Sequence, residues 1–158
     1  MPESERLQIG TRVPDFSLPS TGGGTFRLSA QRGKNLVLYF YPRDATAGCT
    51  SEAEAFRDNH LAFSELNCIV AGVSRDTLAS HEKFSKALGL PFDLLADVDE
   101  SVCSLFGVMK QKNMYGKMVR GIERSTFLLD TSGVLRQEWR GVKVPGHVQT
   151  VLGAVKSL

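Results

Sequence analysis

The run NLVLYFY at residues 35–41 constrains the fold of this chain more than any other feature, because it is almost entirely apolar and ends at Pro42. A strand with apolar side chains on both faces must be covered on both faces, which is typical of a strand inside a parallel sheet flanked by helices. A second β-branched run, CIVAGVS at residues 68–74, follows a segment with apolar residues at helical spacing, about residues 50–67. Together these segments predict a strand, a helix and a parallel strand.

The remaining segments continue this alternation along the chain. Alternate apolar residues on both sides of the glycine turn 22–24 predict a short N-terminal hairpin. After residue 74 we expect, in order, a helix at 77–89 closed by Gly89, a strand at 91–97, a short helix at 99–108, a loop rich in Lys, Met and Gly, strands at 121–130 and 134–141 joined by the turn 131–133, and a helix at 147–158.

This order of elements predicts an α/β fold. Parallel strands connected by helices, followed by an antiparallel strand pair and a last helix, give a central mixed sheet flanked by helices that is thioredoxin-like in outline, with an N-terminal hairpin extension. A chain of 158 residues, 42% of them hydrophobic, has the usual size of one domain with one core. We therefore expect residues 1–158 to form a single domain.

Composition excludes several classes of function. Nineteen Lys and Arg against seventeen Asp and Glu give a formal charge of +2, and the basic residues are spread along the chain, which argues against nucleic acid or a membrane surface as the main partner. The start, MPESERLQIG, is charged and polar, and no apolar run reaches the length of a membrane span. Three widely spaced cysteines suit free thiols in a reducing compartment. We expect a cytoplasmic protein.

Cys49 lies where the first buried strand is followed by a helix. In open α/β sheets the ligand site lies outside the carboxyl ends of the parallel strands. The positive end of the helix favours a thiolate over a thiol. Ser51 and Glu54 fit a capping box, so the helix begins either at Ser51 or a few residues earlier with Thr46 as its cap. Both starts predict a reactive thiol in place of an inert core cysteine.

The residues before Cys49 separate the possible chemistries. A dithiol oxidoreductase needs Cys-x-x-Cys at this turn, but here Thr46 occupies the first position. Pro42, Thr46 and Cys49 match the pattern P-x-x-x-T/S-x-x-C, in which the chain resembles the peroxiredoxins. The stretch FYPRDATAGCTSEAEAFRD is specifically similar to the peroxiredoxin Q group, also called bacterioferritin comigratory proteins. The resemblance extends over nearly the whole chain, through KNLVLYFYPRD and RSTFLLD.

This resemblance implies a thiol-dependent peroxidase that needs no cofactor and serves antioxidant defence. Cys49 would attack hydrogen peroxide or an organic hydroperoxide and become a sulfenic acid. Thr46 would hydrogen-bond the peroxide, Pro42 would shield the thiolate from water, and Arg124 in RSTFLLD would supply the cation. On that strand Ile122, Arg124, Thr126 and Leu128 are expected to share one face.

The other titratable residues near the motif have weaker signals. Glu52 lies on the same side of the helix as Cys49; alone it would oppose thiolate formation, but paired with Arg124 it would orient the guanidinium. The histidines His60, His81 and His147 have no metal-ligand spacing, so we expect them to be structural or exposed and expect no metal site.

The route by which the oxidised sulfur of Cys49 returns to a thiol stays open. The positions at which the peroxiredoxin Q group carries a resolving cysteine hold Glu54 and Ser85 in this chain. Cys68 should lie at the opposite edge of the sheet, because a helix of about 18 residues rises roughly 27 Å. Cys103 should lie on the carboxyl-end side and is the candidate resolving residue. The alternatives are therefore recycling of Cys49 alone by an external thiol (thioredoxin, glutaredoxin or glutathione), a disulfide with Cys103, and an intermolecular route.

Two rival classes of function remain. A thioredoxin-fold binding protein with an incidental cysteine would show no peroxide turnover, and a protein disulfide oxidoreductase is disfavoured by the missing Cys-x-x-Cys motif. The expected partners are a hydroperoxide and a thiol reductant, and the expected assembly is a monomer or weak homodimer.

Overall fold

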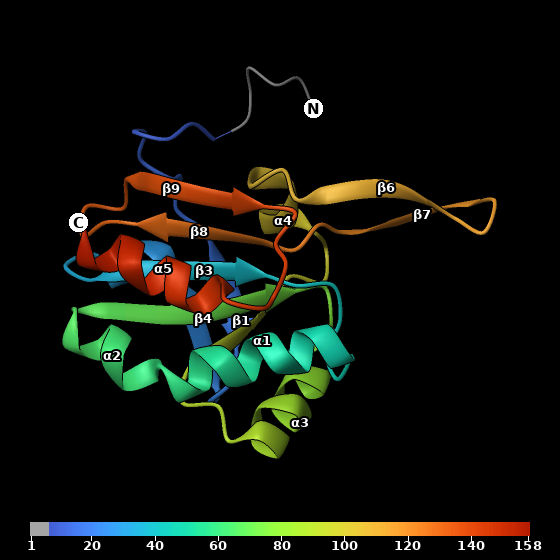
Figure 1. The fold of residues 1–158 in the computed structure, drawn as a ribbon, viewed down its shortest axis with the longest axis horizontal. Helices are drawn as coiled ribbons and strands as arrows, with labels where there is room; N and C mark the ends of the chain where they lie inside the picture. Colours follow the sequence, from blue (N-terminus) through green and yellow to red (C-terminus); the bar gives the residue numbers. More distant parts are fainter. Residues whose placement is uncertain (1–6) are drawn as a thin grey trace.

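The computed structural model describes residues 7–158 and contains a seven-stranded mixed sheet. The charged residues 1–6, on which part of the cytoplasmic expectation depends, lie outside the described residues. The strand order is β2-β1-β5-β4-β3-β8-β9, with a separate two-stranded sheet of β6 and β7. The central strands β3 (Asn35–Phe40), β4 (Cys68–Ser74) and β5 (Asp93–Ala96) are parallel, and all three end on the side from which β6 and β7 project (Figure 1).

The remaining elements confirm the predicted alternation. The first hairpin pairs β1 with β2, and β8 and β9 pair antiparallel beside β3. The bounds of these elements are β1 (Ser17–Ser20), β2 (Gly24–Arg27), the short helix η2 (Leu28–Gln31), α1 (Ala47–Asp58), α2 (His60–Glu65), α3 (Leu78–Leu88), α4 (Ser101–Leu105), β6 (Met109–Met114), β7 (Lys117–Ile122), β8 (Ser125–Leu129), β9 (Leu135–Arg140) and α5 (His147–Lys156).

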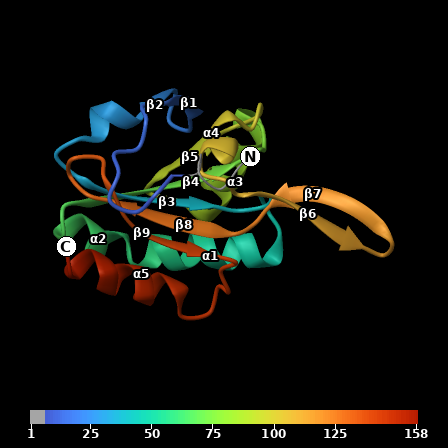
Figure 2. The same ribbon diagram turned by 90° about the horizontal axis from the view of Figure 1, so that it is seen from above.

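The sheet separates two apolar clusters. Because successive side chains of a strand point to opposite faces, β3 contributes Val37 and Tyr39 to one cluster and Leu38 and Phe40 to the other. The helices α1, α2 and α5 cover the first face, and α4 packs on the second (Figure 2). The apolar run of β3 is therefore buried on both faces, as predicted. Among residues 7–158, no helix is long and apolar enough to cross a membrane.

The long helix expected at about residues 50–67 is two helices. It begins at Ala47, with Thr46 as the N-cap residue, so the capping box of Ser51 and Glu54 is wrong. It breaks at Asn59, whose side-chain amide donates to the Ala55 carbonyl at 2.8 Å and so competes with the backbone ladder. The break lets α2 turn toward the start of β4.

The segment expected as a loop, between α4 and the late strand pair, is the hairpin of β6 and β7. Tyr115 and Gly116 at its tip both have positive φ (54° and 80°), which is the backbone of a two-residue primed turn. The strand expected at 121–130 is accordingly interrupted before Ser125. Ile122 ends β7 and packs in the cluster on the α4 face, whereas Leu128 of β8 packs on the α1 face. The predicted common face for Ile122 and Leu128 is therefore wrong.

Candidate active site

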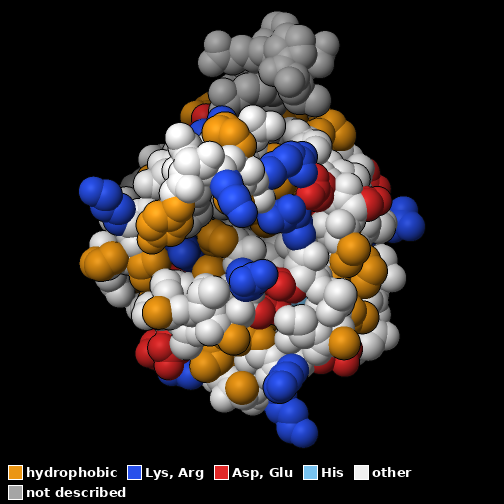
Figure 3. All heavy atoms as spheres, turned by 90° about the vertical axis from the view of Figure 1, so that its right-hand side faces the viewer, with side chains coloured by type: hydrophobic (Ala, Val, Ile, Leu, Met, Phe, Trp, Pro, Cys, Tyr) orange, Lys and Arg blue, Asp and Glu red, His pale blue; other side chains and the backbone are white. Residues whose placement is uncertain are grey.

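Cys49 lies in the first turn of α1, just after the loop that leaves β3. We call residues 42–46 the β3–α1 loop. The Cys49 side chain is 1% exposed and packs in the cluster on the α1 face. The end of β3 and the start of α1 lie on the face shown in Figure 3, where Lys and Arg side chains gather in the upper half and the centre. The sulfur is thus at the positive end of a twelve-residue helix.

Arg124 lies in the connection between β7 and β8 and reaches the sulfur. Its Nη2 atom is 3.5 Å from Cys49 Sγ, and its Nη1 atom donates to Glu52 Oε1 at 2.8 Å. The guanidinium packs closely over the first turn of α1, because a Cβ atom at Gly48 would lie 3.0 Å from Arg124 Nη2. The structure therefore brings together Cys49, Glu52 and Arg124, which is the arrangement that the family resemblance implied.

Glu52 is fully buried, and its Oε2 atom has no hydrogen-bond partner among residues 7–158. Burial raises the pKa of Glu52 to about 7, although the charge of Arg124 and its hydrogen bond act in the opposite direction. Burial would also lower the pKa of Arg124, but the charges of Glu52 and Cys49 outweigh it and raise that pKa. The guanidinium accordingly stays charged beside the sulfur.

Thr46 and Pro42 lie on the exposed β3–α1 loop. Thr46 occupies the N-cap position of α1 without capping it, since its Oγ1 donates to the Arg43 carbonyl at 2.9 Å. The oxygen of a hydroxyl that donates its proton can still accept a hydrogen bond through its lone pairs.

The other two cysteines lie elsewhere. Cys68 begins β4 and pairs with Asn35, at the end of the sheet away from Cys49, and burial raises the pKa of its thiol to about 12. Cys103 lies in α4 and packs on the opposite face of the sheet from Cys49. Burial, together with the Asp97 carboxylate, raises the pKa of the Cys103 thiol far above its usual value. All three thiols are free.

Comparison with known proteins assigns the chain to a family. Residues 9–138 match the model of the AhpC/TSA family. The chain belongs to that family. It is 47% identical to peroxiredoxin Bcp of Bacillus subtilis over 152 residues, which are 96% of this chain and 97% of the relative. It is 45% identical to a putative peroxiredoxin bcp of Coxiella burnetii over 147 residues, 93% of this chain and 97% of the relative.

A solved structure extends this agreement to the fold. The bacterioferritin comigratory protein of Xanthomonas campestris, studied for its alkyl peroxide reduction activity, superposes with a TM-score of 0.89 at 46% identity and covers 96% of each chain. The resemblance to the peroxiredoxin Q group and the thioredoxin-like fold are therefore confirmed, and this chain is a thiol peroxidase of the peroxiredoxin class.

Two histidines of this peroxiredoxin have more specific surroundings than the sequence indicated. His147 at the start of α5 is 7% exposed, and its Nε2 atom lies 2.8 Å from Thr126 Oγ1. Burial lowers the pKa of His147 to about 4, with a further contribution from the charge of Arg124. His81 is fully buried and lies 2.8 Å from the Asp44 carboxylate. The sequence signal for His81 was its place inside a predicted helix, and the signal for His147 was its place at a predicted helix start.

One group among residues 7–158 has the geometry to hold a metal ion, namely Asp44, Asp76 and His81. The two Asp44 oxygens already accept hydrogen bonds from neighbouring side chains, and His81 uses both ring nitrogens within the protein. These contacts make Asp44 and His81 members of a hydrogen-bond network within the protein. The absence of a metal or other cofactor stays a prediction.

Proposed function

We propose that Cys49 is the peroxidatic nucleophile of this peroxiredoxin and that it reduces hydrogen peroxide and organic hydroperoxides to water and alcohols. The observation that carries this proposal is the contact of 3.5 Å between Arg124 Nη2 and Cys49 Sγ, across 75 residues of sequence. A cation in hydrogen-bond range favours the thiolate and the negative charge that develops during the reaction. For organic hydroperoxides, the alkyl peroxide reduction studied for the Xanthomonas campestris relative is further support.

The reaction follows from the position of the sulfur. The Cys49 thiolate attacks the outer peroxide oxygen, so that an S–O bond forms while the O–O bond breaks. The departing oxygen takes the electron pair and a proton and leaves as water or an alcohol. The sulfur is oxidised to a sulfenic acid and the peroxide is reduced.

Other residues of the loop and the helix have supporting roles in this proposal. Thr46 accepts a hydrogen bond from the peroxide, because its own proton is directed to the Arg43 carbonyl. Pro42 limits the access of water to the thiolate. Glu52 holds the guanidinium of Arg124 in place through the 2.8 Å ion pair.

For the return of Cys49 to a thiol, we favour a one-cysteine mechanism with an external reductant. An external thiol condenses with the sulfenic acid and releases water, and a second thiol then reduces the mixed disulfide. Cys103 packs on the other face of the sheet and Cys68 at its other end, which supports this choice. The reductant is thioredoxin, glutaredoxin or glutathione, in a cytoplasmic setting, and the protein acts in antioxidant defence as a monomer or weak homodimer.

Mass spectrometry after a single oxidation tests the proposal. The wild type and the variants Cys49→Ser and Cys103→Ser are treated with one equivalent of hydrogen peroxide and then with a sulfenate trap. We expect one trapped sulfenate at Cys49 in the wild type and in Cys103→Ser, and none in Cys49→Ser. An unmodified Cys49 in the wild type would overturn the proposal. A disulfide between Cys49 and Cys103 would replace the one-cysteine mechanism with a two-cysteine mechanism.

A further inference from the structure

The β3–α1 loop is attached to the protein body through one of its side chains. Pro42, Arg43, Ala45 and Thr46 are exposed, whereas Asp44 is 8% exposed. A loop that is otherwise in solvent depends on its buried member for a fixed conformation. The contacts of Asp44 therefore decide where this loop lies.

Three side chains donate to the Asp44 carboxylate. Tyr41 Oη donates to Oδ1 at 2.6 Å, and Ser80 Oγ donates to Oδ2 at 2.8 Å. His81 Nδ1 also lies 2.8 Å from Oδ2. The Asp44 amide in turn donates to Asp76 Oδ2 at 2.9 Å. Although burial alone would raise the pKa of Asp44, the hydrogen bonds from His81 and Tyr41 lower it, so the carboxylate stays ionised.

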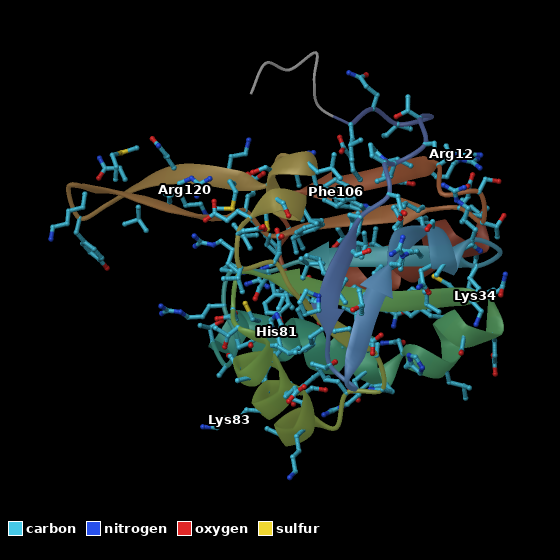
Figure 4. The ribbon with its side chains drawn as sticks, turned by 180° about the vertical axis from the view of Figure 1, so that it is seen from behind. Arg12, Lys34, His81, Lys83, Phe106 and Arg120 are labelled. Carbon is cyan, nitrogen blue, oxygen red and sulfur yellow. The ribbon has the colours of Figure 1, made fainter. Side chains whose placement is uncertain are left out.

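His81 connects this carboxylate to the central sheet. Its Nε2 atom lies 3.0 Å from the Leu95 carbonyl of β5, so the ring is held at both nitrogens. Both partners are acceptors, so each ring nitrogen faces a hydrogen-bond acceptor. His81 belongs to α3, and its ring lies between that helix and the sheet, toward the end of the molecule from which the hairpin of β6 and β7 projects (Figure 4). His81, which contacts the Asp44 carboxylate, is thus itself fixed to two elements outside the loop, α3 and β5.

The backbone beside Asp44 is strained. Ala45 has φ of 63°, a left-handed conformation that residues other than glycine rarely adopt. Such a conformation persists only where the surrounding structure holds it in place. Here Asp44 holds one side, and on the other side the Thr46 carbonyl accepts from the Thr50 amide of α1 at 2.9 Å. The strained residue directly precedes the proposed peroxide contact.

We propose that Asp44 is a positioning residue for the peroxide, which acts by fixing the β3–α1 loop so that the Thr46 hydroxyl is directed at a peroxide over Cys49. This inference rests on the proposed function. The Cys49 thiolate does not depend on Asp44, because its cation, Arg124, comes from the connection between β7 and β8 and contacts α1 directly. Loss of the anchor should therefore slow the reaction with peroxide but not the reaction of the same thiolate with a reagent that makes no use of Thr46.

Two rate constants measured on the same variants test this. One is the second-order rate constant with hydrogen peroxide, and the other is the rate of Cys49 alkylation by iodoacetamide at the same pH. We expect Asp44→Ala to lower the peroxide rate constant by up to about tenfold, which is the loss expected when the one hydrogen bond of Thr46 is misdirected. The alkylation rate should stay within about twofold of the wild type.

Milder substitutions keep the test usable if Asp44→Ala folds poorly. Asp44→Asn retains an oxygen that accepts from Tyr41, so we expect a smaller loss of the peroxide rate than in Asp44→Ala. His81→Asn places an amide donor near the position of Nδ1, so it should retain more of the peroxide rate than His81→Ala. Circular dichroism at the assay temperature confirms that each measured variant is folded.

Asp97 offers a matched control. It is fully buried, and its carboxylate accepts from the amides of Val102 and Cys103 at 3.1 and 2.6 Å, on the α4 side of the sheet. We expect Asp97→Asn to lower the melting temperature while both rate constants stay unchanged.

The outcomes separate this inference from the proposed function. A large loss of the peroxide rate alone in the Asp44 variants, with partial rescue by Asn, supports it. Equal losses of both rates, or peroxide rates equal to that of the wild type, overturn it while leaving Cys49 as the nucleophile. If the wild type forms no Cys49 sulfenic acid, both proposals fail.

Discussion

Cys49 and Cys103 are both buried thiols in helices that follow parallel strands, yet their surroundings have opposite charge. Cys49 is 1% exposed and lies 3.5 Å from the Arg124 guanidinium. Cys103 is fully buried, and its amide donates to the Asp97 carboxylate at 2.6 Å. Burial and this carboxylate raise the pKa of the Cys103 thiol. Because both thiols are buried, what distinguishes their surroundings is the sign of the nearest charge, a guanidinium beside Cys49 and a carboxylate beside Cys103.

The two helix starts also differ. Within the described chain no side chain caps α1, because the Thr46 hydroxyl donates to the Arg43 carbonyl. The first amides of α4 already have the Asp97 carboxylate as their acceptor. A helix start whose amides are occupied by a protein carboxylate offers little to another anion. The α1 start can therefore act on a thiolate and its substrate, whereas the α4 start is used for stability.

The largest expected difference is between Cys49→Ser and Cys103→Ser. Removing the nucleophile should lower peroxide turnover by about a thousandfold or more, whereas Cys103→Ser should keep it near the wild-type rate. Turnover is measured as loss of peroxide with dithiothreitol as the reductant. A Cys103→Ser variant as inactive as Cys49→Ser would break the comparison.

Removal of the cation beside Cys49 should have the next largest effect on the peroxide rate constant. Arg124→Met should lower the second-order rate constant with hydrogen peroxide by about 100- to 1000-fold, because it removes a donor at the site of developing charge. Arg140→Met is the matched control, since Arg140 is similarly buried but donates to the Phe106 and Gly107 carbonyls. Stopped-flow kinetics of both variants should separate them. Similar rate losses in the two variants would indicate that the loss comes from removing a buried arginine in general, and not from removing the cation beside Cys49.

The Glu52 carboxylate gives an effect on stability. Its pKa is raised by burial to about 7, so the folded state binds a proton that the unfolded state loses near its usual value of 4.5. Stability from this group is therefore present at low pH and is lost as the pH rises from about 4.5 through 7, by up to about 3 kcal/mol.

Thermal unfolding at pH 5 and pH 8 measures this loss. Glu52→Gln should weaken the fall in melting temperature between the two values, whereas Glu54→Gln, on the same helix but partly exposed, should leave it unchanged. An unaltered pH profile in Glu52→Gln would show that the ion pair with Arg124 outweighs burial.

The smallest effect concerns the hydroxyl at the α1 start. Thr46→Val should lower the peroxide rate constant by about tenfold, which is the loss expected for one hydrogen bond to a neutral group. Thr46→Ser keeps the hydroxyl and should stay close to the wild type. The same stopped-flow assay measures both, and equal rates in Val and Ser would remove Thr46 from the proposed site.

The central sheet and the nucleophile could be predicted because their signals are local. An apolar run of a buried strand and the helical spacing of apolar residues repeat within a short window, and β3, β4, α3 and α5 lie where these patterns predict them. The hairpin of β6 and β7 was missed because most of its described residues are not buried and its strands are defined mainly by pairing with each other. The break at Asn59 was missed because the apolar pattern continues across it.

The sequence by itself determined the α/β order and the spacing of Pro42, Thr46 and Cys49 at one strand-to-helix turn, since neighbours in sequence must be neighbours in space. Only the tertiary structure decided which cysteine has a cation beside it, because Arg124 and Asp97 reach their thiols through strand pairing and helix packing. It also decided that His81 lies against Asp44, a contact across 37 residues. Such contacts depend on the face on which each helix packs, and that face is set by the whole sheet.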